Sequence, residues 1–262
     1  MKSWRPAFAS VFLAAFLAVG SPSGTSRTPS GRTNQVRVKL FYETLCPYSQ
    51  KFITKQLWPT YLRLSAYMRV TLVPYGMATL SETIAADGQR VNQIRCQHGH
   101  HECVANMVQA CAASLYKRTY RLLAYVACME SSPTPHRVGK TCASRVGLSW
   151  SELTRCVTSK KGPRLLLKMG RKTSTHKPPI RGVPYVVVNG KQDESVQDRA
   201  AENLFALVCS MFAEPVPVAC ATERPGVVTG KAEVPEQANI TGSSVATATT
   251  VMKEDATTAK PT

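Results

Sequence analysis

Acidic residues are scarce in this 262-residue sequence, which has 16 Asp and Glu against 33 Lys and Arg and a formal net charge of +17. The scarcity is greatest between Arg155 and Arg181, where nine basic residues occur without an acidic one. Such a tract either binds an anionic partner, for example a sulfated glycan or a lipid headgroup, or forms a solvated face of the fold. Nucleic acid is not an expected partner, because no aromatic residues are interleaved with the basic ones.

Long apolar runs are also missing. No run reaches the roughly 18 residues that a membrane-spanning helix needs, so no transmembrane span is expected. The apolar stretch at residues 7–19 follows Lys2 and Arg5 and ends at Ala18-Val19-Gly20, which is the layout of a secretory signal peptide. We therefore interpret residues 1–20 as a signal peptide and expect the mature chain to be in an oxidising compartment.

The remaining chain divides by composition. Residues 21–35 are rich in Ser, Thr, Gly and Pro and predict a flexible leader. Residues 221–262 are rich in Ala, Thr and Val with scattered Pro and Gly, and predict a disordered tail. A single folded domain is expected between them, at residues 36–220.

Hydrophobic patterns within the domain predict an α/β fold. Strands are expected at 36–42, 69–76 and 182–190, the last ending in a hairpin turn, and helices at 47–61, 102–131 in one or two pieces, 149–158, 163–169 and 196–211. Pro59 should kink or break the first helix. The order is βαβ, a helical insert at about 95–170, and then ββα. This is a thioredoxin-like plan with an all-helical, disulfide-stapled insertion.

The nine cysteines leave one unpaired thiol in an oxidising compartment. Cys46 is the candidate, because it directly precedes a helix whose N-terminal N–H groups favour a thiolate over a thiol. The alternative is that Cys46 is half of a structural bridge.

The other eight cysteines are structural disulfide candidates: Cys96, Cys103, Cys111, Cys128, Cys142, Cys156, Cys209 and Cys220. Proximity in sequence favours the pairs Cys209–Cys220 and Cys142–Cys156. Cys103 and Cys111 lie on one predicted helix with a rise of about 12 Å between them, beyond the reach of a disulfide, so each must pair elsewhere.

Residues 96–111 form the most specific motif of the chain, with Cys96, Gln97, His98, Gly99, Glu102, Cys103, Asn106 and Cys111 at fixed spacings. Cys96 and Cys103, with His98, His100 and His101, could be zinc ligands. We favour disulfides instead, because secreted cysteines are more often oxidised, and we expect no metal and no cofactor.

This motif resembles the signature C-Q-H-G-x-x-E-C-x-x-N-x-x-x-x-C of the gamma-interferon-inducible lysosomal thiol reductase (GILT) family, and the resemblance extends over Val36–Cys220. It implies a thiol–disulfide oxidoreductase acting on disulfide-containing proteins. Pro184 resembles the cis proline that shapes the substrate groove in thioredoxin-like folds, although a lone proline can also simply mark a strand edge.

The sequence departs from the family at the active site. Where the family has Cys-x-x-Cys, this chain has Cys46-Pro47-Tyr48-Ser49. Ser49 can donate a hydrogen bond to the Cys46 thiolate, but it cannot resolve a mixed disulfide. We therefore expect impaired reductase turnover, with release by a small external thiol or a substrate thiol.

The alternative hypothesis is an inactive secreted binding protein that uses the 155–181 tract on anionic partners. The N-glycosylation sequon at Asn239 lies in the tail, outside the predicted domain. Secretion to the exterior is therefore the expected destination, with the lysosome as the alternative.

Overall fold

The structure is a computed structural model, and it describes residues 35–84, 86–117 and 119–221. The expected signal peptide, nearly all of the expected leader, and the expected tail with Asn239 lie outside the described residues, apart from Gln35 and Ala221. No helix among the described residues combines the length and the apolar character needed to cross a membrane.

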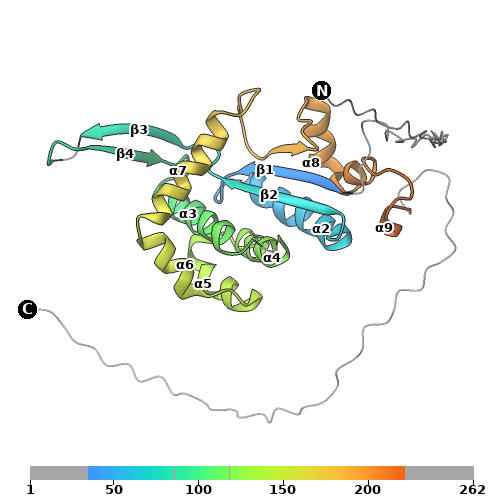
Figure 1. The fold of residues 1–262 in the computed structure, drawn as a ribbon, viewed down its shortest axis with the longest axis horizontal. Coiled ribbons are helices and arrows are strands. Elements are labelled where there is room, and N and C mark those ends of the chain that lie inside the picture. The colour runs from blue at the N-terminus through green and yellow to red at the C-terminus, as the bar shows by residue number, and fades with distance from the viewer. Residues whose placement is uncertain (1–34, 85, 118, 222–262) are drawn as a thin grey trace, which may run out of the picture. The chain divides into compact units, whose positions relative to one another are not determined.

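The central sheet contains β2, β1 and β5 in that order (Figure 1). β1 (Val36–Tyr42) pairs in parallel with β2 (Met68–Pro74), and β5 (Tyr185–Val188) runs antiparallel to β1 on its other side. A helical segment connects β1 to β2, as α1 (Pro47–Phe52), the π-helix η1 (Ile53–Leu57) and α2 (Trp58–Leu64).

The irregular turn in this connection has a local cause. Pro59 has no N–H and its ring excludes the carbonyl four residues earlier, so the regular α-helical ladder cannot continue through it. The π-helical residues 53–57 lie directly before Trp58-Pro59, where the sequence predicts a kink or break.

The expected ββα ending is wrong in one respect. After the turn at Asn189-Gly190 only Lys191 pairs back, with Val188, and no second strand forms among the described residues. The chain instead enters α8 (Glu194–Cys209), which Asp193 caps. Gln197 on α8 takes the place of the strand: its Oε1 accepts from the Val186 N–H at 2.9 Å and its Nε2 donates to the Val186 carbonyl at 2.7 Å. On the outer edge of β5, the Gln197 side chain thus pairs with the backbone of Val186, and the Lys191 backbone pairs with that of Val188.

The insertion between β2 and β5 is not wholly helical. It begins with an antiparallel hairpin of β3 (Thr79–Ile84) and β4 (Arg90–Arg95), which the sequence analysis missed. Both strands are exposed at nearly every position, so they lack the alternation that identifies a half-buried strand. The helices that follow are α3 (His100–Leu115), α4 (Thr119–Glu130), α5 (Pro135–Val146), α6 (Trp150–Thr158) and α7 (Lys161–Ser174). Of these, α5 was not predicted.

Disulfides join these helices, and one expected pair is wrong. Cys111 of α3 bonds to Cys156 of α6, and Cys128 of α4 bonds to Cys142 of α5, so the pair Cys142–Cys156 does not form. Proximity in sequence failed because the packing of α3 against α6, and of α4 against α5, decides which sulfurs meet. Cys209 pairs with Cys220, as expected, next to the short helix α9 (Val218–Ala221).

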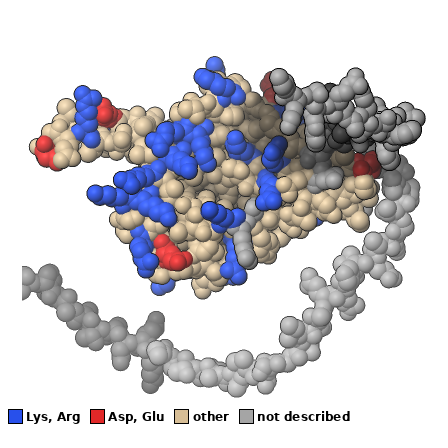
Figure 2. Space-filling model, viewed as in Figure 1, with Lys and Arg blue, Asp and Glu red and all other residues tan. Residues whose placement is uncertain are grey.

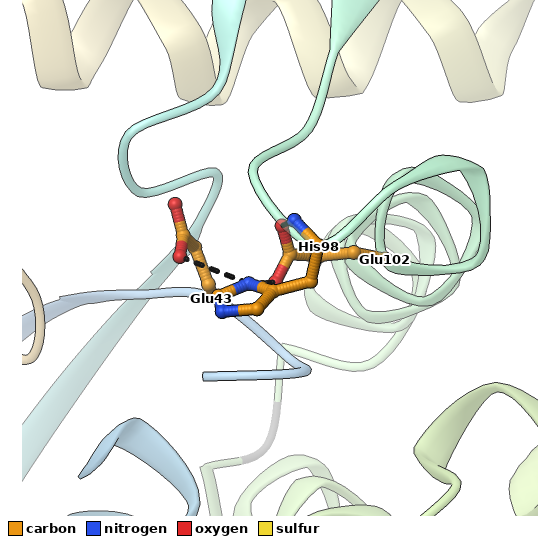
Figure 3. Close-up of side chains that lie close together, drawn as sticks. All are labelled: Glu43, His98 and Glu102. Carbon is orange, nitrogen blue, oxygen red and sulfur yellow. Dashed lines mark hydrogen bonds and ion pairs between the residues drawn. The ribbon is translucent and has the colours of Figure 1, made fainter. Parts of the chain in front are cut away.

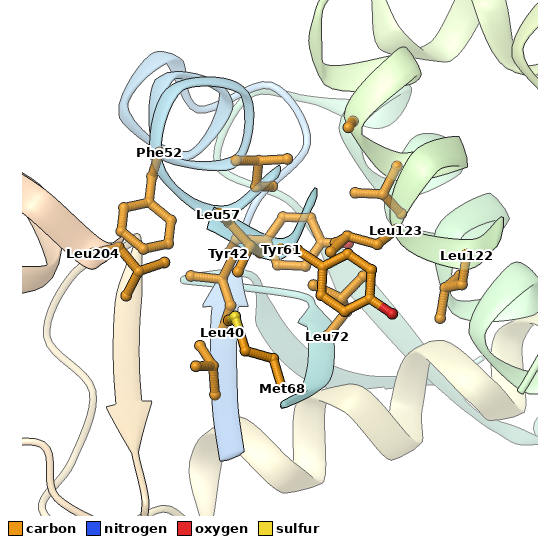
Figure 4. Packing of buried hydrophobic residues seen from close by; sticks show 14 of the residues in the cluster. Leu40, Tyr42, Phe52, Leu57, Tyr61, Met68, Leu72, Leu122, Leu123 and Leu204 are labelled. Carbon is orange, nitrogen blue, oxygen red and sulfur yellow. The ribbon is translucent and has the colours of Figure 1, made fainter. Parts of the chain in front are cut away.

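The main core lies between the sheet and the surrounding helices (Figure 4). Leu40 and Tyr42 of β1 pack with Phe52, Leu57 and residues of α2, α4 and α8.

A chain of polar groups runs through this core. The Tyr42 hydroxyl donates to Gln109 Oε1 at 2.5 Å, and Gln109 Nε2 donates to Glu130 Oε1 at 2.6 Å. Glu130 Oε2 has no hydrogen-bond partner among the described residues.

This buried carboxyl predicts a pH dependence of folding. Burial, with a smaller contribution from Glu102, raises the pKa of Glu130 well above its usual value, although the Gln109 bond opposes this. The native state therefore keeps a proton that the unfolded chain releases, so this group lowers the stability as the pH rises above about 4.3, the unfolded value. We expect Glu130→Gln to flatten the decline of the free energy of unfolding between mildly acidic and neutral pH, as measured by urea denaturation. Glu82→Gln on the exposed hairpin should leave the decline as in the parent, and an unchanged slope in Glu130→Gln would contradict the prediction.

Candidate functional site

Cys46 lies where β1 leads into α1. It is the N-cap residue of α1, with Pro47 in the first helical turn, as the sequence predicts. All nine cysteines are among the described residues, and Cys46 is the one that forms no disulfide. Its Sγ is buried and lies 3.8 Å from the Val183 carbonyl oxygen, and the Val183–Pro184 peptide bond is cis. The structure therefore brings Cys46 and the loop before β5 together across the sheet.

Ser49 is placed differently from the expectation. Its side chain is fully buried, and its Oγ accepts a 3.5 Å hydrogen bond from the Glu43 N–H. No hydrogen bond joins Ser49 Oγ to Cys46 Sγ in the described part of the chain. Ser49 is thus hydrogen-bonded to the start of the loop at residues 43–45, which leads into Cys46.

The motif residues of the insertion hold the same loop from the other side. Asn106 Oδ1 accepts from the Thr44 N–H at 3.1 Å, and Glu102 Oε2 accepts from the Leu45 N–H at 3.3 Å. The Thr44 hydroxyl also donates to the Glu102 carbonyl. Two side chains of α3 therefore fix the backbone of the two residues that directly precede Cys46. We call this set of contacts the α3 latch.

A disulfide and a glycine shape the turn that begins α3. Cys96 bonds to Cys103, with 5.5 Å between their Cα atoms, and so closes residues 96–103. Gly99 is the N-cap of α3 with a φ of 85°, a conformation that favours glycine. The pair excludes Cys96 and Cys103 as zinc ligands. Gln97 is exposed.

A carboxylate–imidazole cluster adjoins the latch (Figure 3). His98 Nδ1 lies 2.6 Å from Glu102 Oε2 and 3.6 Å from Glu43 Oε2, and both carboxylates are fully buried. The sequence analysis missed Glu43; its place between a buried strand and Cys46 was the available signal. The three side chains offer donor atoms within 4.8 Å of one another, a set that could hold a cation. They already satisfy one another in part, because Glu102 also accepts from the His98 backbone N–H at 3.1 Å.

Glu43 explains a glycine on the neighbouring loop. A Cβ at Gly76 would lie 2.1 Å from Glu43 Cγ, and Gly76 has a φ of 58°. The Met77 N–H donates to Glu43 Oε1, so Glu43 links the loop after β2 to the loop after β1. Burial raises the pKa of Glu43, while the Met77 N–H bond opposes the rise.

A groove with a volume of about 360 Å³ has Val183 in its lining, and the Val183 carbonyl oxygen lies 3.8 Å from Cys46 Sγ, so the groove adjoins Cys46. Val183 and Pro184 form one wall, and Tyr48, Phe52 and Lys55 form another. The Tyr48 side chain is 74% exposed. An extended peptide could therefore lie against Pro184 with one of its sulfurs near Cys46.

The α3 latch yields a prediction for Glu102→Ala. This change removes the acceptor of the Leu45 and His98 N–H groups, and an unpaired buried donor costs about 1–3 kcal/mol. We expect a loss of that order in the free energy of unfolding. We also expect slower formation of a mixed disulfide between Cys46 and a peptide disulfide, measured by mass spectrometry.

Glu82→Ala is the matched control, since Glu82 makes only an exposed ion pair with Arg90. Its effect should stay below about 1 kcal/mol. Equal stability and equal reactivity of the two variants would show that the latch has no role.

Comparison with known proteins relates the chain to thiol reductases. Residues 37–146 match the family described as gamma interferon inducible lysosomal thiol reductase (GILT). The chain is 35% identical to the gamma-interferon-inducible lysosomal thiol reductase of Carassius auratus, over 71% of this chain and 72% of that protein. It is 32% identical to GILT-like protein 1 of Drosophila melanogaster, over 71% and 78% of the two chains. The mouse (Mus musculus) reductase is 30% identical, over 77% and 75%.

Among solved structures, the oxidoreductase DsbA from Xylella fastidiosa is similar with a TM-score of 0.40 and 18% identity, over 69% of this chain and 90% of that one. A thioredoxin-like oxidoreductase from Silicibacter pomeroyi DSS-3 gives a TM-score of 0.41 with 15% identity, over 66% and 88%.

Proposed function

Because the chain belongs to the gamma interferon inducible lysosomal thiol reductase family, and is thus a thiol–disulfide oxidoreductase, we propose that Cys46 alone performs its chemistry. The observation that carries this proposal is the state of Cys46 among nine cysteines. It is the free thiol, it lies at a helix N-terminus, and it touches the loop of the cis proline.

The first step is attack by the Cys46 thiolate on one sulfur of a substrate disulfide. A bond forms between Cys46 Sγ and that sulfur, the substrate disulfide breaks, and the second substrate sulfur leaves as a thiolate. In a Cys-x-x-Cys enzyme the second cysteine would then attack Cys46 Sγ. Ser49 cannot, because an alcohol does not form a disulfide. The mixed disulfide therefore persists until another thiol attacks it.

Two routes complete the turnover. In reduction, a small thiol attacks Cys46 Sγ and releases the reduced substrate, and a second small thiol then frees Cys46, so two thiols become one disulfide. In isomerisation, another thiolate of the substrate attacks the substrate sulfur of the mixed disulfide, which frees Cys46 without net oxidation or reduction. The small thiol is the partner that the reduction route requires, whereas isomerisation uses a thiol of the substrate itself.

The substrates we propose are proteins whose disulfides can enter the groove beside Pro184. The groove is lined by apolar residues, among them Val183, Pro184 and Val186, and by charged ones, among them Lys51, Lys55 and Asp198. The substrate backbone has to lie against the Val183–Pro184 loop. An unfolded or partly unfolded segment can do this, whereas a disulfide inside a folded protein cannot bring its backbone there.

We propose that the protein follows the secretory route to the exterior, with the lysosome as the alternative destination. The signal-peptide layout of residues 1–20 supports entry into that route. The Carassius auratus and mouse relatives are named lysosomal thiol reductases, whereas the sequon at Asn239 lies outside the predicted domain of this chain.

Restoring the missing thiol tests the proposal. Ser49→Cys should gain reduction of a denatured disulfide protein with a small-thiol donor, because an internal resolving thiol replaces the slow external one. Ser49→Ala is the control, since it removes the hydroxyl without adding a thiol, and it should not gain activity. Cys46→Ser should lose all activity. A folded Ser49→Cys variant with no gain over the parent would contradict the assignment of Ser49 as the limiting feature. Full activity in Cys46→Ser would contradict the assignment of Cys46 as the nucleophile.

A further inference from the structure

Basic side chains from separate parts of the sequence converge on one face of the domain. Figure 2 shows Lys and Arg gathered on the face that carries α7. The face includes Arg37 and Lys39 of β1, Arg69 of β2, Lys117 after α3, and Lys168 and Lys172 of α7. We call these six residues the basic face. It combines part of the acid-free tract at residues 155–181 with strand residues more than 80 positions earlier.

The positive charges of the basic face are not compensated within the domain. None of its residues forms an ion pair with a carboxylate in the part of the chain that the structure describes. Arg37 and Arg69 are direct partners in the parallel pairing of β1 with β2, an arrangement in which like charges repel. Burial, with the nearby charges of Lys168 and Lys39, lowers the pKa of Lys172. A bound anion would relieve this repulsion.

The basic face is hollowed. A depression of about 290 Å³ is lined by Arg37, Lys39 and Arg69. A second of about 380 Å³ is lined by Lys117, Lys168 and Lys172, and Thr71 lines both. The two depressions are therefore adjacent, and neither shares a lining residue with the groove beside Cys46.

We propose that the basic face binds a linear sulfated glycan. Six cations spread over two adjoining depressions match a chain of repeated anionic groups better than a single phosphate or sulfate, which would occupy only one depression. The arrangement also provides polar contacts, since Thr71, Ser114 and Asn189 line the same depressions.

The distribution of exposed apolar residues favours the glycan over a membrane surface. Proteins that lie on a bilayer combine basic residues with apolar side chains that enter the lipid. The large hydrophobic residues that are exposed in the described part of the chain are Tyr48, Leu62, Tyr67, Leu80, Ile84, Val91, Tyr120 and Val218. None of them lines either depression.

Heparin is the probe, and a charge-matched pair of double variants provides the test. Lys39→Gln with Lys172→Gln removes two charges from the centre of the basic face. Lys140→Gln with Arg145→Gln removes two from exposed positions of α5, outside the depressions. We expect the first variant to bind heparin about tenfold more weakly at physiological salt, since each cation near an anionic surface contributes on the order of 1 kcal/mol and the change is partly screened. The α5 variant should bind as the parent does.

Three results would overturn the proposal: no heparin binding by the parent, equal losses in the two variants, or parent binding to phosphatidylserine vesicles as strong as to heparin and equally sensitive to Lys39→Gln with Lys172→Gln. Equal losses would indicate an effect of net charge alone, and the vesicle result would identify a lipid partner. Cys46→Ser should retain heparin binding, so this test is independent of the thiol chemistry. Thermal unfolding of each variant confirms that the fold is intact.

Discussion

The position of the nucleophile depends on hydrogen bonds that α3 accepts from residues more than 50 positions earlier in the sequence. Asn106 and Glu102 bind the backbone N–H groups of Thr44 and Leu45, and these two residues lead directly into Cys46. The Cys96–Cys103 bond closes the turn from which α3 begins, and the Cys111–Cys156 bond fastens α3 to α6. The disulfides of the insertion therefore do more than stabilise a helical appendage. They hold the element that positions Cys46.

The buried charges beside the latch follow from the same arrangement. Two carboxylates, of Glu43 and Glu102, lie under one imidazole, and the Glu43 carboxyl occupies the space that a side chain at position 76 would need. Burying carboxylates is unfavourable unless donors surround them. The N–H groups of Leu45 and His98 donate to Glu102 and the Met77 N–H donates to Glu43 Oε1, whereas Glu43 Oε2 has no hydrogen-bond partner among the described residues and only the His98 ring at 3.6 Å. These polar contacts join the loop after β1, the loop after β2 and the start of α3.

The sequence predicted best the features that depend on local hydrophobic pattern and on the backbone properties of proline. The strand at 36–42, the helix that begins at Pro47 and the interruption before Pro59 follow from local pattern and proline chemistry. The spacing of the 96–111 motif predicted the family, and the odd cysteine count predicted a free thiol at Cys46. What could not be predicted depends on tertiary packing. Three features arise from contacts between distant segments: the pairing of Cys156 with Cys111, the hydrogen bonds of Gln197 to the outer edge of β5, and the approach of Glu43 to His98. The exposed β3–β4 hairpin escaped detection because it has no buried face.

The central claim is that Cys46 forms a mixed disulfide that the chain cannot resolve by itself. It is tested most directly by exposing the protein, with Cys46 as its free thiol, to two single-cysteine peptides joined by a disulfide, removing the released peptide thiol, and mapping the products under non-reducing conditions by mass spectrometry. The account predicts one peptide on Cys46, stable until a small thiol is added and then released in full, with the Cys96–Cys103, Cys111–Cys156, Cys128–Cys142 and Cys209–Cys220 bonds unchanged. A peptide released without added thiol, or attached at any cysteine other than Cys46, would contradict it.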